Sequence, residues 1–368
     1  MEQKIYNEYV EILKEELIPA MGCTEPIAVA YAAAVAVQAL GEKPESVEVN
    51  VSANIIKNVK SVVVPCTGGL RGIGAAVCAG IVAGCPEKEL EILEEITGEQ
   101  KVEMKKMLDT MPMTIRESDK EYIFDIQIKA CAGGHSGYVE IAGFHTNVIC
   151  VKKDDEIIRE KAYEEQGSSC ATDRSLLTVE KIIEFADCVD VADVEEVLQR
   201  QIDYNWAIAE EGMTGNWGAA IGKTLMEAYG NSVHNRAKAM AAAGSDARMY
   251  GCELPVVINL GSGNQGMTTS LPVIVYAKEL NVSKEMMLRA LVVSNLITIH
   301  MKTGIGRLSA YCGAISAGCG AGAGICYLYG GRAYEISHVI VNAVAINSGV
   351  VCDGAKASCA AKIASAVE

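Results

Sequence analysis

The spacing of apolar residues divides the chain into segments of different kinds. Apolar positions at three- and four-residue steps predict an amphipathic helix over residues 1–18. A second helix is expected to begin with Thr24 as its N-cap and to end at Gly41. A glycine-rich turn at 68–74 then opens a third, alanine-rich helix that ends near Gly84.

Alternation of apolar and polar residues predicts strands in the same part of the chain. It is clear over residues 46–54, and a short β-branched run follows at 61–64. Further along, glycine-rich turns separate three more runs, at 122–130, 138–141 and 147–152. These three runs predict a small antiparallel sheet.

From about residue 176 the pattern is almost wholly helical, and alanine and glycine are abundant. A loop-like stretch near residue 170 is the expected boundary between two parts. We therefore predict an α+β protein with a mixed domain over residues 1–170 and an all-helical domain over residues 171–368. With 35 glycines and only 5% aromatic residues, the buried Gly/Ala-rich helices of the second domain can pack closely.

Three stretches in the last third, 254–277, 308–331 and 336–352, contain no charged residue. Two of them reach the length of about 20 residues that a bilayer-spanning helix needs. They contain Asn, Gln, Ser and many glycines, however, and they lack aromatic belts. Helices that are apolar all round are also found in the centre of a large helical domain, so we expect no membrane span.

Composition excludes several classes of protein. The formal net charge of −15 argues against a nucleic-acid partner, because such a partner requires a basic face. The charged, amphipathic start of the chain does not have the pattern of a secretory signal, so we expect a cytoplasmic protein. Its 14 cysteines should then be reduced thiols, most of them small buried residues and a few of them ligands or nucleophiles.

A G-x-G-x-x-G sequence occupies residues 261–266, directly after the strand-like run 255–260. A dinucleotide site would need a βαβ unit around this sequence, whereas its neighbours have helical patterns and Pro272 follows. Two interpretations stay open. The segment is either a tight loop between buried helices, or a polar nest whose N–H groups and side chains hold a small carboxylate.

Three cysteines lie in uncharged, glycine-rich surroundings: Cys23, Cys312 and Cys352. The chain has no C-x-x-C pair, so the spacings of zinc ribbons and bacterial ferredoxins are absent. Four others are expected to be buried small residues: Cys78, Cys85, Cys188 and Cys252. Spacing alone does not separate ligands from packing residues, because Cys312, Cys319 and Cys326 could also share one helix face.

Four sequence motifs are more informative together than each is alone. In chain order they read MGCTEP, SGNQGMTTSLPV, GRLSAYCGAISAGCGAGAGI and NSGVVCDGAKASCAAKI. Between Met21 and Ile363 they resemble the L-cysteine desulfidase family, which is related to the α chain of iron–sulfur L-serine dehydratases. Four motifs in the same order are far more specific than the G-x-G-x-x-G sequence alone.

The resemblance implies a cofactor and a reaction. The cofactor is an oxygen-sensitive [4Fe-4S] cluster held by three cysteines, which the match places at Cys23, Cys312 and Cys352. The fourth iron is open and acts on the substrate as a Lewis acid, and no pyridoxal phosphate takes part. The substrate is a small amino acid, L-cysteine, which is converted to pyruvate, ammonia and hydrogen sulfide.

An elimination of this kind also requires groups that bind the substrate and remove its proton. A general base must remove the Cα proton, and His145, in a short match to a Ser-His-Thr loop of the dehydratases, is the first candidate, with His300 second. Arg307 is expected to bind the substrate carboxylate bidentately. The remaining contacts with the carboxylate or the amine are expected from Ser262, Asn264 and Gln265.

Other functions remain in competition. L-Serine dehydratase is the nearest, although the dehydratases have an Asp-Pro-Val-Gly-Gly string where this chain continues from Cys352 with Asp353-Gly354-Ala355-Lys356. This difference favours the desulfidase branch. A nicotinamide-dependent oxidoreductase rests on the G-x-G-x-x-G sequence only, and a cluster-based redox sensor would normally need a DNA-binding module. A homodimer is compatible with the sequence.

Overall fold

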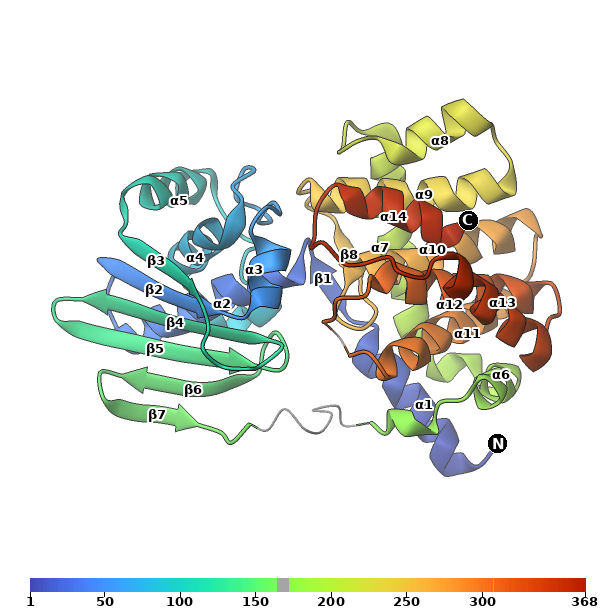
Figure 1. Ribbon diagram of the computed structural model, residues 1–368, viewed down its shortest axis with the longest axis horizontal. Helices are drawn as coiled ribbons and strands as arrows, with labels where there is room; N and C mark the ends of the chain where they lie inside the picture. The colour runs from blue at the N-terminus through green and yellow to red at the C-terminus, as the bar shows by residue number, and fades with distance from the viewer. Residues whose placement is uncertain (164–171, 307) are drawn as a thin grey trace. The chain divides into compact units, whose positions relative to one another are not determined.

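The computed structural model describes residues 1–163, 172–306 and 308–368, which Figure 1 colours along the chain. The described residues form two compact units. We call one the helical unit, drawn from the described residues of Met1–Ala20, Cys170–Cys352 and Ala357–Glu368, and the other the mixed unit, drawn from those of Met21–Ser169 and Asp353–Lys356. Each unit therefore combines stretches that are far apart in the sequence.

The mixed unit is built on a six-stranded sheet with the order β3-β2-β4-β5-β6-β7. The strands are β2 (Ser46–Val51), β3 (Met113–Glu117), β4 (Asp125–Ala132), β5 (His135–Ala142), β6 (Val148–Lys153) and β7 (Glu156–Glu160). The pair β2–β3 is parallel, whereas β2–β4, β4–β5, β5–β6 and β6–β7 are antiparallel. The sheet is therefore mixed and larger than the antiparallel sheet that the sequence predicts.

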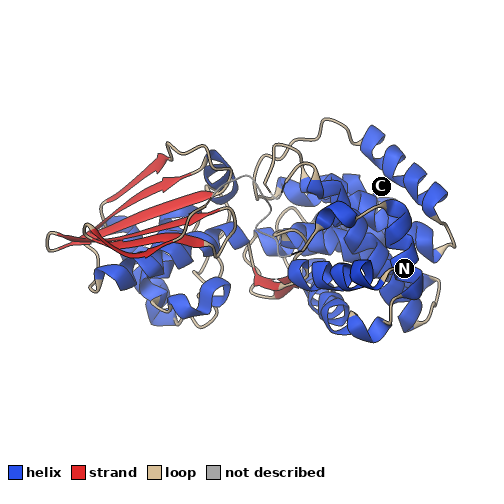
Figure 2. Ribbon diagram, turned by 90° about the horizontal axis from the view of Figure 1, so that it is seen from below, coloured by secondary structure: helices blue, strands red, loops and turns tan. Residues whose placement is uncertain are grey.

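One face of this sheet is apolar, because apolar residues of neighbouring strands pair directly opposite one another on it. Val49 pairs with Ile128, Ile128 with Val139, and Val139 with Val151. Helix α2 (Thr24–Leu40) lies directly on the sheet, since a Cβ added at Gly137 would come within 2.1 Å of the Ala36 carbonyl oxygen. Figure 2 shows the strands with helices beneath them. The other helices are α3 (Ala53–Val59), η1 (Pro86–Glu91), α4 (Gly72–Ala83) and α5 (Gly98–Thr110).

The predicted strands at 46–54, 122–130, 138–141 and 147–152 are all present in the sheet. Two strands of this sheet were not predicted: β7 is fully exposed, and β3 has four exposed residues of five, so neither has a buried apolar face. The β-branched run 61–64 is not a strand, because only Val63 forms a bridge, with Arg71. The residue that precedes α2 is Cys23 rather than Thr24, which is the first helical residue.

The helical unit contains one small two-stranded sheet and the long helices of the chain. The sheet pairs β1 (Pro19–Met21) with β8 (Pro255–Val257). The helices are α1 (Gln3–Glu16), η2 (Arg174–Leu176), α6 (Val179–Cys188), η3 (Val191–Asp193), α7 (Glu195–Thr214), α8 (Ile221–Tyr229), α9 (Val233–Met249), α10 (Gly263–Glu279), α11 (Lys284–Thr303), α12 (Gly313–Leu328), α13 (Ala333–Ile346) and α14 (Ser358–Val367).

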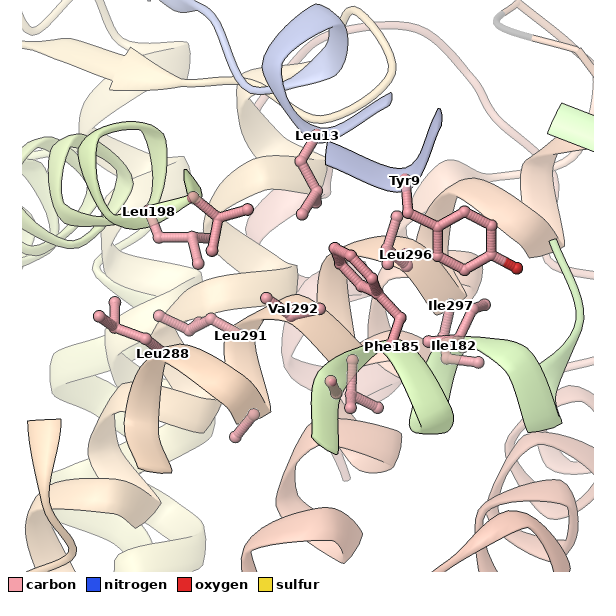
Figure 3. Close-up of a cluster of buried hydrophobic side chains, with 14 of the residues drawn as sticks. Tyr9, Leu13, Ile182, Phe185, Leu198, Leu288, Leu291, Val292, Leu296 and Ile297 are labelled. Atoms are coloured by element: carbon pink, nitrogen blue, oxygen red, sulfur yellow. The ribbon is translucent and has the colours of Figure 1, made fainter. Parts of the chain in front are cut away.

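The core of the helical unit explains why the first helix belongs to it. Tyr9 and Leu13 of α1 are fully buried in a cluster with Phe185 of α6 and Leu291 of α11 (Figure 3). The Tyr9 and Phe185 rings pack edge to face, with centroids 5.3 Å apart. Burial of such large side chains contributes about 1.5–3 kcal/mol each, so α1 is an integral part of this core.

The α+β class predicted from the sequence is confirmed, and the part of the chain after residue 176 is mainly helical with buried Gly/Ala-rich helices. Over the described residues, no helix combines the length and the apolar character that crossing a membrane requires. The uncharged stretches instead contribute buried segments such as α10 and most of α12.

Candidate functional site

The G-x-G-x-x-G sequence forms a tight turn that opens helix α10. Asn259 and Ser262 form an isolated antiparallel bridge, so the two residues between them, Leu260 and Gly261, make the turn. Both have positive φ angles, 50° and 77°, as a type I′ turn requires. A leucine in this conformation is strained. Ser262 then caps α10, its Oγ accepting a hydrogen bond from the Gln265 N–H at 3.5 Å.

Buried amides hold this turn in place. Asn205 of α7 accepts a hydrogen bond from the Val257 N–H at 2.9 Å and donates to the Val257 carbonyl at 3.2 Å. Asn259 donates to the Asn295 side chain at 3.0 Å, and Asn295 exchanges two hydrogen bonds with Gln201. Because buried amides are costly unless they have partners, this network fixes the end of β8 and the start of the turn.

Helices α10 and α12 lie side by side and run in the same direction. A Cβ added at Gly313, the first residue of α12, would come within 2.6 Å of the Gln265 side chain, and one added at Gly324 would come within 2.8 Å of Val273. Later residues of α12 therefore contact later residues of α10, as in two parallel helices. Their N-termini lie at the same end, where unpaired N–H groups and helix dipoles favour negative charge.

Cys312 and Cys352 are paired next to these N-termini. Cys312 is the N-cap of α12. Tyr311 and Val351 form an isolated antiparallel bridge, flanked by hydrogen bonds from the Cys312 N–H to Val350 (3.2 Å) and from the Cys352 N–H to Ala310 (2.7 Å). In this register the two cysteines are diagonal neighbours on one face, with Cβ atoms about 7 Å apart. Tyr311 and Val351 point to the opposite face and are 61% and 58% exposed.

Two buried cations lie close to the same helix ends, and sequence reasoning did not select either of them. Arg248 of α9 is 3% exposed, and its Nη1 donates to Asn264 Oδ1 at 3.1 Å. Lys302 is 2% exposed and lies one turn beyond Thr298, whose hydroxyl bonds Thr269 of α10. The signal for Arg248 was its place, with Asp246, at the end of an alanine-rich stretch of the helix.

Cys23 is in the mixed unit, where it also caps a helix. It is 2% exposed and precedes α2, and its thiol donates to Glu25 Oε2 at 3.1 Å. Asn58 of α3 donates to the other carboxylate oxygen at 3.0 Å. The residues directly after Cys352 belong to the same unit, since a Cβ at Gly354 would come within 2.1 Å of the Lys57 carbonyl oxygen.

The two predicted histidines have separate surroundings, each within its own unit. His145 is half-buried in the loop between β5 and β6, and its ring packs edge to face on Phe124 with centroids 5.0 Å apart. His300 lies two residues beyond Thr298 and therefore on another face of α11. There it interacts with Glu180 of α6. Arg307 lies outside the described residues.

The environment of His300 leads to a pH prediction. Burial lowers the pKa of His300 below its usual value, and the Glu180 carboxylate acts in the opposite direction. As the pH falls below about 6.5, the unfolded chain takes up this proton first, so the folded protein loses stability. Urea unfolding at pH 7.5 and 5.5 should show a larger loss for the wild type than for His300→Gln. Equal losses would contradict this placement of His300.

The remaining cysteines include both buried packing residues and exposed ones. Cys78 and Cys252 are buried, as predicted, whereas the prediction that Cys85 and Cys188 are buried was wrong, because both are exposed. Burial raises the pKa of Cys78 and of Cys319 to about 11. Over residues 1–163, 172–306 and 308–368, no group of three or more His, Cys, Asp or Glu side chains is arranged to hold a metal ion.

Comparison with known proteins places this arrangement in a family. Residues 87–368 match the serine dehydratase alpha chain family. This chain belongs to that family. The family points to a lyase of the iron–sulfur serine dehydratase type, and its members are typically iron–sulfur dependent.

Similar proteins cover the whole chain. A UPF0597 protein of Desulfitobacterium hafniense is 58% identical over 367 residues, which are 100% of this chain and 85% of the relative. UPF0597 proteins of Lachnoclostridium phytofermentans and Treponema denticola are 51% and 44% identical, over 99% and 100% of this chain and 87% of each relative. The likeness therefore includes the N-terminal residues that the family match leaves out, Cys23 among them.

Proposed function

We propose that the protein is an iron–sulfur lyase that eliminates sulfide from L-cysteine. The overall reaction consumes one water and gives pyruvate, ammonia and hydrogen sulfide, without pyridoxal phosphate. The observation that carries the proposal is the Tyr311–Val351 bridge, which brings Cys312 and Cys352 to one face at the N-terminus of α12, beside Gln265. L-Serine dehydration at the same site is the second candidate.

Cys312 and Cys352 of the helical unit suit two of the ligand positions of a [4Fe-4S] cluster, and Cys23 of the mixed unit is the third ligand that the family resemblance implies. Thiolates are the ligands that such clusters prefer, and two of these cysteines cap helices of 16 and 17 residues. A helix N-terminus favours the thiolate form. Arg248 and Lys302 add buried positive charge beside α10 and α12 that would offset the charge of the ligands. When bound, the cluster would supply an open iron as a Lewis acid that makes the thiolate a better leaving group.

The protein's own residues would bind the amino acid and move its proton. The start of α10, Ser262–Gln265, offers N–H groups and two amide side chains to the substrate carboxylate and ammonium. His145 is the candidate base for the Cα proton, and a positioned base contributes about 10²–10⁴-fold to the rate. His300 is the second candidate, because it lies on another face of α11 than Thr298, which bonds Thr269 of α10.

Sequence at the second cysteine favours L-cysteine over L-serine. The segment Asp353-Gly354-Ala355-Lys356 replaces the string that the dehydratases have there, and Gly354 needs its small size and its φ of 95° against Lys57. This local change would alter the surroundings of the leaving group. The choice between thiolate and hydroxide as leaving group therefore depends on the segment after Cys352.

The test uses full-length protein made without oxygen. We expect brown protein with iron and acid-labile sulfide, and sulfide release from L-cysteine with kcat/KM at least tenfold above that for pyruvate release from L-serine. Brief exposure to air should remove activity and iron together. Faster turnover of L-serine would select the second candidate, and undiminished activity after iron removal by a chelator would exclude both.

A further inference from the structure

Among the buried amides of the helical unit, Gln265 makes no side-chain hydrogen bond with a described residue. Asn259 Oδ1 also lacks a partner, but the Asn259 Nδ2 group donates to Asn295. Gln201, Asn205 and Asn295 all make side-chain hydrogen bonds. Gln265 is only 7% exposed. Its Oε1 is buried and accepts no hydrogen bond from a described residue. A buried carbonyl oxygen without a partner lowers the stability of the fold. This one lies against Gly313, the residue directly after Cys312.

The neighbouring amide has a fixed orientation. Asn264 Oδ1 accepts a hydrogen bond from the buried Arg248 at 3.1 Å. The Asn264 Nδ2 group must therefore point away from the guanidinium, and no described residue accepts a hydrogen bond from it. Consecutive residues at the start of α10 thus present a donor, Asn264 Nδ2, and an acceptor, Gln265 Oε1, next to the N–H groups of the first helical turn.

We propose that Asn264 and Gln265 form a receptor for the α-carboxylate and α-ammonium groups of an amino acid. Asn264 Nδ2 donates to the carboxylate, Gln265 Oε1 accepts from the ammonium group, and Arg248 positions Asn264. The site therefore selects α-amino acids over acids that lack the amino group, because such acids leave the buried Oε1 without a partner. The inference rests on the proposed function and adds the atoms that recognise the substrate class.

The test measures binding of L-alanine, which has no leaving group on Cβ, to full-length protein purified without oxygen. Calorimetry should show that L-alanine binds at least tenfold more tightly than propionate. Gln265→Met, which keeps the length of the side chain, should weaken L-alanine at least tenfold and abolish this preference. Its Tm should equal or exceed that of the wild type, because an unpartnered buried amide has been removed.

Gln127→Met is the matched control. Gln127 is similarly buried, 8% exposed, but its Nε2 donates to Asp125 Oδ2 at 2.7 Å in the mixed unit. This variant should lower Tm and leave L-alanine affinity within twofold of the wild type. A merely structural role for Gln265 predicts the same behaviour for both variants.

Gly313→Ala tests the geometry without altering Gln265. The new Cβ would lie 2.6–2.9 Å from the Gln265 amide, which is the far end of a flexible side chain and can move. L-Alanine affinity should fall with little change in Tm. Undiminished L-alanine binding in Gln265→Met, or no preference for L-alanine over propionate in the wild type, would overturn the inference. L-Alanine binding through Gln265 in a protein without lyase activity would instead overturn the proposed function alone.

Discussion

The Cys312→Ala variant is expected to be purified without its full iron content and to lose at least about 10³-fold in sulfide release, equivalent to about 4 kcal/mol of barrier. Alanine cannot ligate iron, and Cys312 occupies the N-terminus of α12, where a thiolate is best stabilised. Cys352→Ala should have the same effect, because Cys352 is its partner across the Tyr311–Val351 bridge. Iron, acid-labile sulfide and absorbance near 400 nm measure the outcome in anaerobic samples.

Cys319→Ala is the matched control on the same helix. Cys319 is fully buried, and burial raises its pKa to about 11, so its thiol stays protonated at neutral pH and is a poor ligand. This variant should keep iron and activity within twofold and lose only about 1 kcal/mol of stability from the missing sulfur atom. Full iron content in Cys312→Ala would remove Cys312 from the ligand set.

The sequence predicted those parts of the fold that carry a strong local pattern. Strands β2, β4 and β5 alternate apolar and polar residues, and β6 begins with a short apolar run; all four were found. Strand β7 has no buried face, so nothing in its composition marks it; it exists because β6 offers it hydrogen bonds. The position of α1 in the helical unit depends on contacts with residues 157 or more positions away, which no local pattern records.

The candidate site was predictable in its residue types more than in its geometry. The uncharged, glycine-rich motifs pointed to Cys312, Cys352 and Gln265, and the structure brings these three segments to adjacent helix ends. Arg248 was missed because its contact with Asn264 comes from tertiary packing of α9 on α10. The strand-like pattern over residues 255–260 did not reveal that Leu260 has a positive φ angle.

The glycines of the G-x-G-x-x-G sequence have a packing role that leads to the second prediction. A Cβ added at Gly266 would come within 2.0 Å of the Val257 carbonyl oxygen and 3.0 Å of the Ile258 carbonyl carbon. These are backbone atoms, and Val257 is held on both sides by Asn205. Gly266→Ala should therefore lower the free energy of unfolding by about 3 kcal/mol or more, since α10 has to move away from β8.

Gly304→Ala separates this clash from a general effect of alanine in the same unit. Gly304 follows α11 with a φ of −79°, is exposed, and has no heavy atom within 4 Å of an added Cβ. Its substitution should change the urea midpoint little, or raise it slightly through reduced entropy of the unfolded chain. Gly266→Ala should also lose L-alanine binding in step with stability, because Gln265 moves with the helix start. A wild-type midpoint for Gly266→Ala would mean that α10 and β8 approach each other less closely than the structure shows, and the placement of Gln265 beside Cys312 would then lose its support.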